Sequence, residues 1–268
     1  MKDAPAGAMP RAAHGLVRAI VPEAWRARLN YHLIGEPAVI KSELRGLSGA
    51  PWRRFAGSRS TARMTERVIE IPWVLSRIHD DRRVLDIGSA YAAPVFLQRL
   101  SSMGIAELHG VDLSRRPVKG IRMTRADVRH MPFPDASFDL VLCVSTLEHI
   151  GLDNAGYGVE AERQATGDLQ ALTEIRRVLA PAGRLLITVP YGRAEDHGWF
   201  KQYDRVGWTA LIQEAAFYPE EEAFFKYGPQ GWAAIDDAAQ LASSGYGELG
   251  APAATGVLCA DLRPRRAA

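Results

Sequence analysis

The pattern of apolar positions changes near residue 82. Between residues 61 and 78, apolar side chains recur every three to four positions, which predicts a helix, and Pro72 predicts a kink within it. After residue 82, short apolar runs alternate with segments of helical periodicity. This alternation predicts βαβ units and a parallel sheet.

The apolar runs predict seven strands, and the segments between them predict helices. The strands are expected at residues 83–88, 108–113, 121–128, 138–145, 184–189, 222–226 and 256–262. The helices are expected at residues 93–100, 168–179 and 206–216, with a short Ala-rich helix within 232–243. The run at 138–145 is almost continuously apolar, as is typical of a strand covered on both faces. We therefore predict an α/β fold with a Rossmann-like, mainly parallel seven-stranded sheet, helices on both faces and an N-terminal helical extension.

The chain divides into an extension and one domain. Residues 1–60 are predicted to be a partly disordered extension. Residues 1–14, rich in Ala, Pro and Gly, are expected to be disordered, residues 16–34 to form a short amphipathic helix, and residues 35–60, with many Gly and Pro, to form an irregular covering segment. Residues 61–268 form the domain. Its cofactor half is expected at about 82–190, and its substrate side and last strands at 191–268.

Composition narrows the class of protein. The 268 residues are 47% hydrophobic and 24% charged with a net charge of +2, so a coiled coil, collagen or a wholly disordered chain is excluded. The small net charge, without a basic stripe, predicts no nucleic-acid partner. No apolar run reaches the 18 or so residues of a membrane span, and residues 1–10 lack the apolar core of a secretory signal. We expect a cytoplasmic protein with no membrane partner, and the pattern carries no signal of oligomeric state.

Acidic residues stand at the ends of three successive predicted strands. They are Asp86, Asp112 and Asp127, and Gly88 closes the first strand. Ligands bind at the carboxyl ends of strands in an open parallel sheet, so the three acids should line one crevice. A carboxylate after the second strand can accept hydrogen bonds from both hydroxyls of a ribose, and Gly88 allows close approach of the backbone.

The loop after the first strand has the wrong sequence for a pyrophosphate. Residues 88–94 read GSAYAAP rather than G-x-G-x-x-G, which disfavours an NAD(P)-dependent oxidoreductase. Asp86 would repel a pyrophosphate but suits the ammonium group of an amino acid. A ligand that combines ribose, adenine and a cationic amino-acid tail is S-adenosylmethionine.

Five short motifs resemble those of one family. They are VLDIG at 84–88, VDLS at 111–114, ADV at 126–128 with MPFPDASFD at 131–139, STLEHI at 145–150 and LAPAGR at 179–184. Together they resemble the class I S-adenosylmethionine-dependent methyltransferases, type-11 group, over residues 82–190. The resemblance implies methyl transfer to an oxygen, or a nitrogen, of a small-molecule acceptor such as a sugar or secondary metabolite.

The resemblance also implies roles for individual residues. Asp112 would bind the ribose, and Asp127 and the Val128 N–H the adenine. Asp86 and Gly88 would lie against the methionine moiety, with Ser145 beside the transferred methyl. Ser89 and Leu113 complete the predicted cofactor-binding set.

One departure from the family keeps a second function open. Ala90 and Ala92 replace the second and third glycines of the family's first loop. A non-catalytic binding or scaffold protein with the methyltransferase fold is therefore the alternative.

His149 is the candidate general base, because its unperturbed pKa suits proton transfer near neutral pH. The alternative is that Glu148 and His149 only hold the loop. Asp196, His197 and Asp204 are further candidates for substrate binding, but their spacing predicts no metal site.

Aromatic residues leave a similar choice. Trp199, Phe200, Tyr203 and Trp208 are expected either to bind substrate or to pack in the core. Glu70 and Trp73, before the first strand, are expected either to touch the cofactor or to pack.

Overall fold

The computed structural model describes residues 61, 63–159 and 161–265. The predictions for residues 1–14, 16–34 and 35–60 lie outside these residues. The division of the chain at residue 60 therefore stays a prediction.

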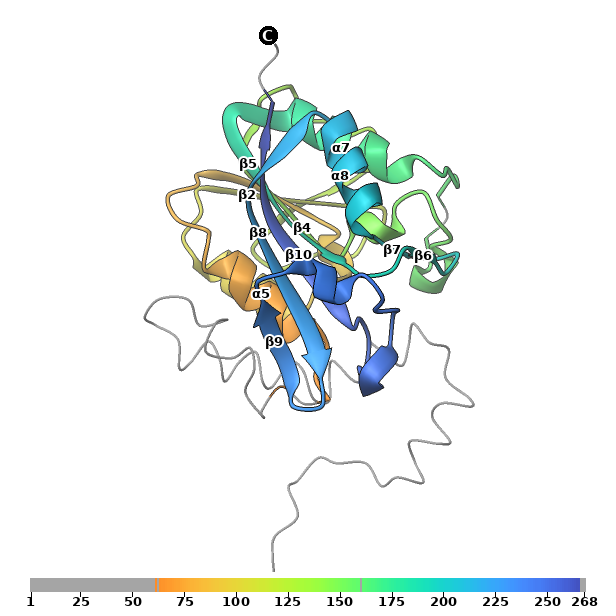
Figure 1. The fold of residues 1–268 in the computed structure, drawn as a ribbon. Coiled ribbons are helices and arrows are strands. Elements are labelled where there is room, and N and C mark those ends of the chain that lie inside the picture. Colours follow the sequence, from red (N-terminus) through yellow and green to blue (C-terminus); the bar gives the residue numbers. More distant parts are fainter. Residues whose placement is uncertain (1–60, 62, 160, 266–268) are drawn as a thin grey trace, which may run out of the picture.

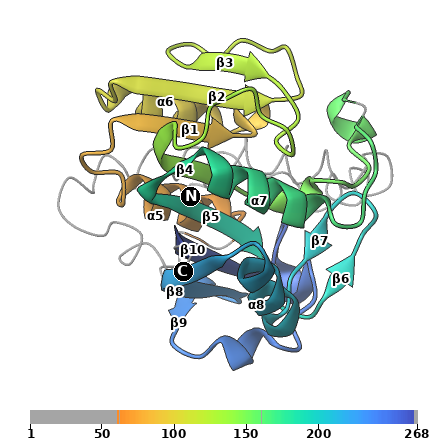
Figure 2. The same cartoon turned by 90° about the horizontal axis from the view of Figure 1, so that it is seen from above.

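The described chain folds around one large mixed sheet (Figure 1). Its eight strands lie in the order β3-β2-β1-β4-β5-β10-β8-β9, which Figure 2 shows from above. The strands are β1 (Arg83–Ile87), β2 (Glu107–Asp112), β3 (Arg122–Arg125), β4 (Phe138–Val144), β5 (Leu179–Pro190), β8 (Phe217–Gly228), β9 (Gly231–Ile235) and β10 (Gly256–Pro264). The first five in this order pair in parallel, and β10 then runs antiparallel to both β5 and β8. The predicted fold class is confirmed.

The prediction of a short helix within residues 232–243 is wrong for its first part. Gly231–Ile235 is the strand β9, which forms a hairpin with β8 and adds an eighth strand to the predicted seven. Only Ala238–Leu241 forms a turn of 3₁₀ helix. The Ala-rich composition favours a helix locally. Trp232, however, is fully buried, and its backbone N–H donates to the Thr61 hydroxyl at 2.9 Å. Tertiary packing therefore overrides local propensity at this edge.

Helices cover both faces of the sheet (Figure 2). One core joins α7 (Gly167–Val178) and α8 (Arg205–Glu214) to alternate residues of the strands, including Leu85, Val141 and Cys143. On the other face, a second core joins α5 (Arg67–Leu75) and α6 (Pro94–Ser102) to the intervening strand residues, which include Val84, Leu140, Leu142 and Cys259. The predicted first helix thus begins at Arg67 rather than at residue 61. Both cysteines, Cys143 and Cys259, are fully buried and unbridged.

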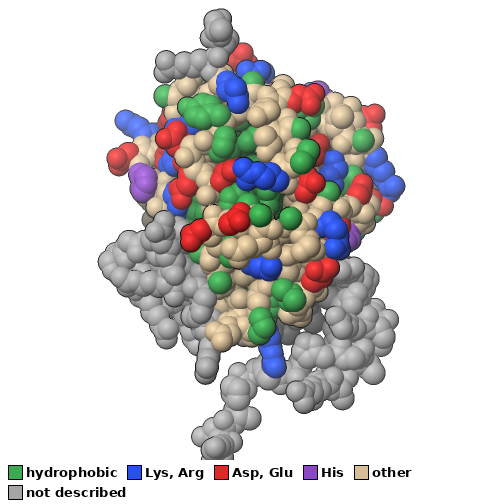
Figure 3. Space-filling view, in the orientation of Figure 1, with side chains coloured by type: hydrophobic (Ala, Val, Ile, Leu, Met, Phe, Trp, Pro, Cys, Tyr) green, Lys and Arg blue, Asp and Glu red, His purple; other side chains and the backbone are tan. Residues whose placement is uncertain are grey.

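Short elements complete the described chain. They are the 3₁₀ turns η3 (Ser89–Tyr91), η4 (Leu147–His149), η5 (Ala155–Tyr157), η6 (Ala238–Leu241) and η7 (Glu248–Gly250), and the two-stranded ribbon of β6 (Glu195–Asp196) and β7 (Lys201–Gln202). No helix within the described ranges is long and apolar enough to cross a membrane. On the face drawn in Figure 3, basic and acidic side chains are interspersed rather than gathered into one charged patch.

The strand order places a switch point beside β1. The chain leaves β1 for β2 on one side and returns to β4 on the other, so the loops after β1 and β4 diverge. A crevice outside the carboxyl ends of the strands is expected at such a point. The predicted site residues follow these strands.

Candidate active site

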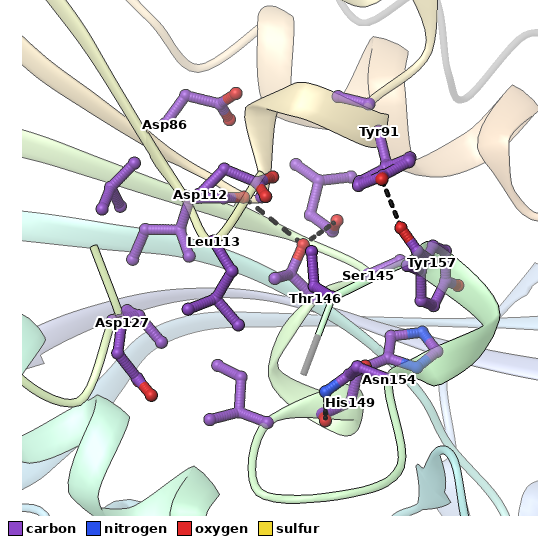
Figure 4. Close-up of a pocket in the computed structure, with 18 of the residues that line it drawn as sticks. Asp86, Tyr91, Asp112, Leu113, Asp127, Ser145, Thr146, His149, Asn154 and Tyr157 are labelled. Atoms are coloured by element: carbon purple, nitrogen blue, oxygen red, sulfur yellow. Dashed lines mark hydrogen bonds between the residues drawn. The ribbon is translucent and has the colours of Figure 1, made fainter. Parts of the chain in front are cut away.

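A pocket opens at the carboxyl ends of β1, β2 and β4 (Figure 4). It contains every predicted site residue except Ser89, namely Asp86, Gly88, Asp112, Leu113, Asp127, Val128, Ser145 and His149. In Figure 4 the three aspartates lie at one side of the pocket, and Tyr91, Tyr157 and His149 lie at the other. The topology therefore brings together residues that are up to 63 positions apart, from Asp86 to His149.

Asp86 is almost completely buried, and Ser89 lies behind it. The Ser89 hydroxyl donates to Oδ2 of Asp86 at 2.6 Å and is itself fully buried. Ser89 thus positions Asp86 rather than lining the pocket. Burial raises the pKa of Asp86 to about 7, against the opposing effect of the Ser89 hydrogen bond. A positively charged group of a ligand beside Asp86 would therefore stabilise the ionised form of this carboxyl group.

Asp112 anchors the loop after β1. Its Oδ2 accepts from the Ala90 N–H at 3.0 Å, and its Oδ1 accepts from the Ser114 N–H at 2.8 Å. Each carboxylate oxygen has two acceptor sites, so Asp112 can still accept from two hydroxyls of a ribose.

The two alanines of this loop adopt ordinary backbone conformations. Ala92 has φ −64° and ψ 158°, and Ala90 is not among the residues with positive φ. Glycine is needed only at Gly88, where φ is +82° and an added Cβ would lie 2.6 Å from Thr146 Oγ1. Replacement of the family's other two glycines therefore requires no strained conformation here.

Asp127 is engaged by a neighbour. Arg129 Nη2 donates to its Oδ2 at 2.7 Å, and Arg129 Nε and backbone N–H approach its Oδ1 at 3.0 and 2.9 Å. These hydrogen bonds lower the pKa of Asp127 although burial opposes them. They also occupy most of its acceptor sites. The Val128 N–H, by contrast, has no hydrogen-bond partner among the residues that the structure describes.

The loop after β4 is tied to helix α5, a contact that sequence reasoning did not foresee. The Ser145 hydroxyl donates to Glu70 Oε1 at 2.6 Å, and Arg67 forms an ion pair with Glu70. Ser145 has φ +42°, a conformation that is uncommon for a residue other than glycine and that clusters at functional sites. Trp73 packs fully buried in the core instead.

Arg67 itself lines the pocket. The available signal was its place in the segment RVIEIPWVL, where Arg67 and Glu70 stand three apart beside an otherwise apolar face. Residues three apart lie on the same side of a helix, so this spacing allows Arg67 and Glu70 to form an ion pair with each other.

His149 lies where η4 meets the β6–β7 segment. Its Nδ1 is 2.8 Å from the Trp199 carbonyl oxygen, so Nδ1 carries the proton and Nε2 keeps its lone pair. The ring stacks on Trp199 at 5.2 Å between centroids. Burial lowers the pKa of His149 to about 4, so the side chain is neutral at pH 7.

A second cavity adjoins the first. It has a volume of about 780 Å³ and shares Arg67, Tyr91, Tyr157 and His149 with the first pocket. Its aromatic walls include Trp199, Phe200 and Tyr246, so these members of the predicted aromatic group face a cavity.

The other candidates of this region have structural contacts. Tyr203 and Trp208 are buried in the core. Asp204 caps α8 by accepting from the Gly207 N–H at 2.7 Å, and His197 lies 3.1 Å from Glu195.

Comparison with known proteins agrees with the resemblance seen in the motifs. Residues 85–187 match a family model described as a methyltransferase domain. The chain is 35% identical over 152 residues to a malonyl-[acyl-carrier protein] O-methyltransferase of Halorhodospira halophila, covering 52% of this chain and 45% of that protein. It is 31% identical over 107 residues to a ubiquinone/menaquinone biosynthesis C-methyltransferase of Hahella chejuensis, covering 40% and 36%.

A solved structure has the same fold. The crystal structure of an S-adenosylmethionine-dependent methyltransferase from Methanosarcina mazei superposes with a TM-score of 0.50 at 12% identity, covering 73% of this chain and 98% of that one. The sequence matches span less than half of each relative's own length. Residues 85–187 therefore carry the methyltransferase domain that the motifs predict.

Proposed function

We propose that this chain, which carries a class I S-adenosylmethionine-dependent methyltransferase domain, is an enzyme that methylates an oxygen or nitrogen of a small molecule. The observation that carries the proposal is the pair of adjoining cavities. One lies at the strand ends that the motifs mark, the other is walled by aromatic rings, and Arg67 and His149 line both. A donor and an acceptor bound in the two cavities would meet at these residues.

The first pocket suits S-adenosylmethionine residue by residue. Asp112 has free acceptor sites for the ribose hydroxyls, and the Val128 N–H is available to an adenine nitrogen. Asp86 would face the ammonium group, and Gly88 leaves the space in which a ligand can approach the backbone. Arg67, a cation in the pocket wall, suits the carboxylate of the methionine moiety.

Asp127 would contribute less to binding. Arg129 already occupies most of its acceptor sites, so the carboxylate serves mainly to hold the backbone and side chain of Arg129.

The protein's contribution to catalysis would be mainly positioning. The bound cofactor supplies a methyl group on a sulfonium, which is already a good leaving group. The chain aligns an acceptor with that methyl group and excludes water from the junction of the cavities. Ser145, fixed by Glu70, and the stacked pair of His149 and Trp199 form the rigid parts of that junction.

Calorimetric titration with S-adenosylmethionine and with S-adenosylhomocysteine tests the proposal. We expect micromolar binding of both compounds and its loss in Asp112→Ala. Exposed Glu107, at the amino end of β2, provides the control variant Glu107→Gln, which should bind normally. Absence of binding by the unmodified chain would refute the proposal and favour a non-catalytic protein with this fold.

A further inference from the structure

The second cavity contains a buried carboxyl group that the fold leaves incompletely satisfied. Glu148 lines this cavity but not the first, and its residue is 3% exposed. Its Oε2 has no hydrogen-bond partner among the residues that the structure describes. Its Oε1 is 3.9 Å from His149 Nε2, too far for a hydrogen bond. Buried polar atoms are nearly always paired, so the missing partner of Glu148 is expected to arrive with a ligand.

The neighbouring carboxyl groups are in a different position. Glu70 accepts from Ser145 and pairs with Arg67. Glu66 accepts from the Ala254 N–H at 3.3 Å and lies 3.7 Å from Arg67. Glu148 is therefore the acid of this wall that lacks a close cation and a complete set of donors.

One part of the wall of this cavity consists of aromatic rings. His149 and Trp199 are stacked, and Phe200 lies 4.5 Å from both Trp199 and Tyr246 between ring centroids. Tyr157 packs edge-on to His149 at 5.5 Å. A space bounded by ring faces and edges binds a flat ring by stacking and edge-to-face contacts.

We propose that the acceptor is a flat aromatic or heteroaromatic compound bearing a ring hydroxyl or N–H, and that Glu148 binds this group and removes its proton. The inference rests on the proposed methyl transfer and names its acceptor class and its base. It assigns to His149 the role of a wall and positioning residue.

The step balances as a simple displacement. The acceptor oxygen or nitrogen forms a bond to the methyl carbon while the carbon–sulfur bond breaks and its electron pair stays on sulfur. The acceptor proton passes to Oε2 of Glu148 and then to solvent. No oxidant, reductant or metal takes part.

The two candidate bases differ in their expected pH dependence. Burial raises the pKa of Glu148 to about 8, so its basic form accumulates as the pH rises through that value. His149, with its pKa lowered to about 4, is already fully basic at pH 6. The charged and titratable groups that act on Glu148 are Glu66, Arg67, Glu70, His149, Cys143, Tyr203 and Tyr246.

The test compares acceptors and variants of the full chain. Probes are 8-hydroxyquinoline, a catechol, a hydroxyflavone and 2-aminopyridine, with cyclohexanol and glucose as saturated controls. Binding to the chain loaded with S-adenosylhomocysteine is measured by calorimetry, and methyl transfer by release of labelled product. Glu148→Gln, His149→Gln and Glu107→Gln are compared, and thermal unfolding confirms that each folds.

We expect at least one aromatic probe, and neither saturated control, to bind and be methylated. Glu148→Gln should lower kcat on the order of 100-fold or more and abolish the rise in rate between pH 6 and 9. Its affinity for S-adenosylmethionine should stay within about twofold of the original, because Glu148 lies outside the cofactor pocket. His149→Gln should keep the rise in rate.

Three results would overturn the inference. They are binding of the saturated controls alone, binding of no probe at all by a chain that binds the cofactor, and an unchanged pH profile in a folded Glu148→Gln. Loss of cofactor binding in the unmodified chain would instead count against methyl transfer itself. The two proposals therefore fail in distinguishable ways.

Discussion

Replacing Gly88 with alanine should be one of the most damaging small changes in the cofactor pocket. Two separate costs act at this position. The residue has φ +82°, where an L-residue with a side chain loses about 1–2 kcal/mol. The added Cβ would also lie 2.6 Å from Thr146 Oγ1 and 2.9 Å from its Cγ2.

The second cost is steric and arises because a hydrogen bond holds the Thr146 side chain in place. Its hydroxyl donates to the Val144 carbonyl at 3.0 Å, so the side chain cannot turn away without losing that bond. Overpacking of this kind costs about 1–3 kcal/mol. The two terms together predict that Gly88→Ala lowers the free energy of unfolding by about 2–5 kcal/mol.

Gly104 offers a matched control. It has φ +73°, but nothing lies within 4 Å of an added Cβ, so Gly104→Ala should lose only the conformational term of about 1–2 kcal/mol. Urea denaturation of both variants, and of Gly88→Ala combined with Thr146→Ala, separates the two costs. The double variant should recover most of the steric term. Equal destabilisation by Gly88→Ala and Gly104→Ala would refute the reasoning.

Two further predictions concern the acids of the pocket. Burial raises the pKa of Asp86 to about 7, so the free energy of unfolding should fall as the pH rises toward that value, and a ligand cation should reverse this effect. The affinity for S-adenosylmethionine, measured by calorimetry, should therefore increase from pH 5.5 to 7. An equal increase in Asp86→Asn would contradict the assignment. Asp112→Asn should weaken cofactor binding about tenfold to a hundredfold, as expected for hydrogen bonds to a charged group. Asp127→Asn should weaken it less than about tenfold, because Arg129 already occupies the Asp127 carboxylate. The reverse ranking would show that Asp127 is the main contact.

The cofactor half could be predicted because its information is local. The first three short apolar runs end at an acid or a glycine, and parallel pairing puts such ends at one edge of the sheet. Asp86, Asp112 and Asp127 therefore lie in one pocket as expected. The role of each acid was not predictable from the sequence. Ser89 donates a hydrogen bond to Asp86 and Arg129 donates to Asp127, and only the side-chain geometry reveals these contacts.

The edge strand β9 and the contact of helix α5 with the loop after β4 were harder to predict. The strand β9 has the composition of a helix and becomes a strand only because β8 offers a pairing edge and the core accepts Trp232. The partnership of Glu70 with Ser145 spans 75 positions. No periodicity or motif signals a hydrogen bond over such a separation.

The two cavities of the site are built from different parts of the chain. The cofactor pocket is built from strand ends that the central sheet fixes. The wall around Glu148 is assembled from η4, the residues before α5 and the segment at Trp199 and Phe200, which meet only in the folded chain. Substitutions of wall residues that do not line the first pocket should therefore change acceptor turnover while leaving cofactor affinity nearly intact, since residues without shared partners contribute additively. Arg67, Tyr91, Tyr157 and His149 line both cavities, so they are positions where this independence should fail.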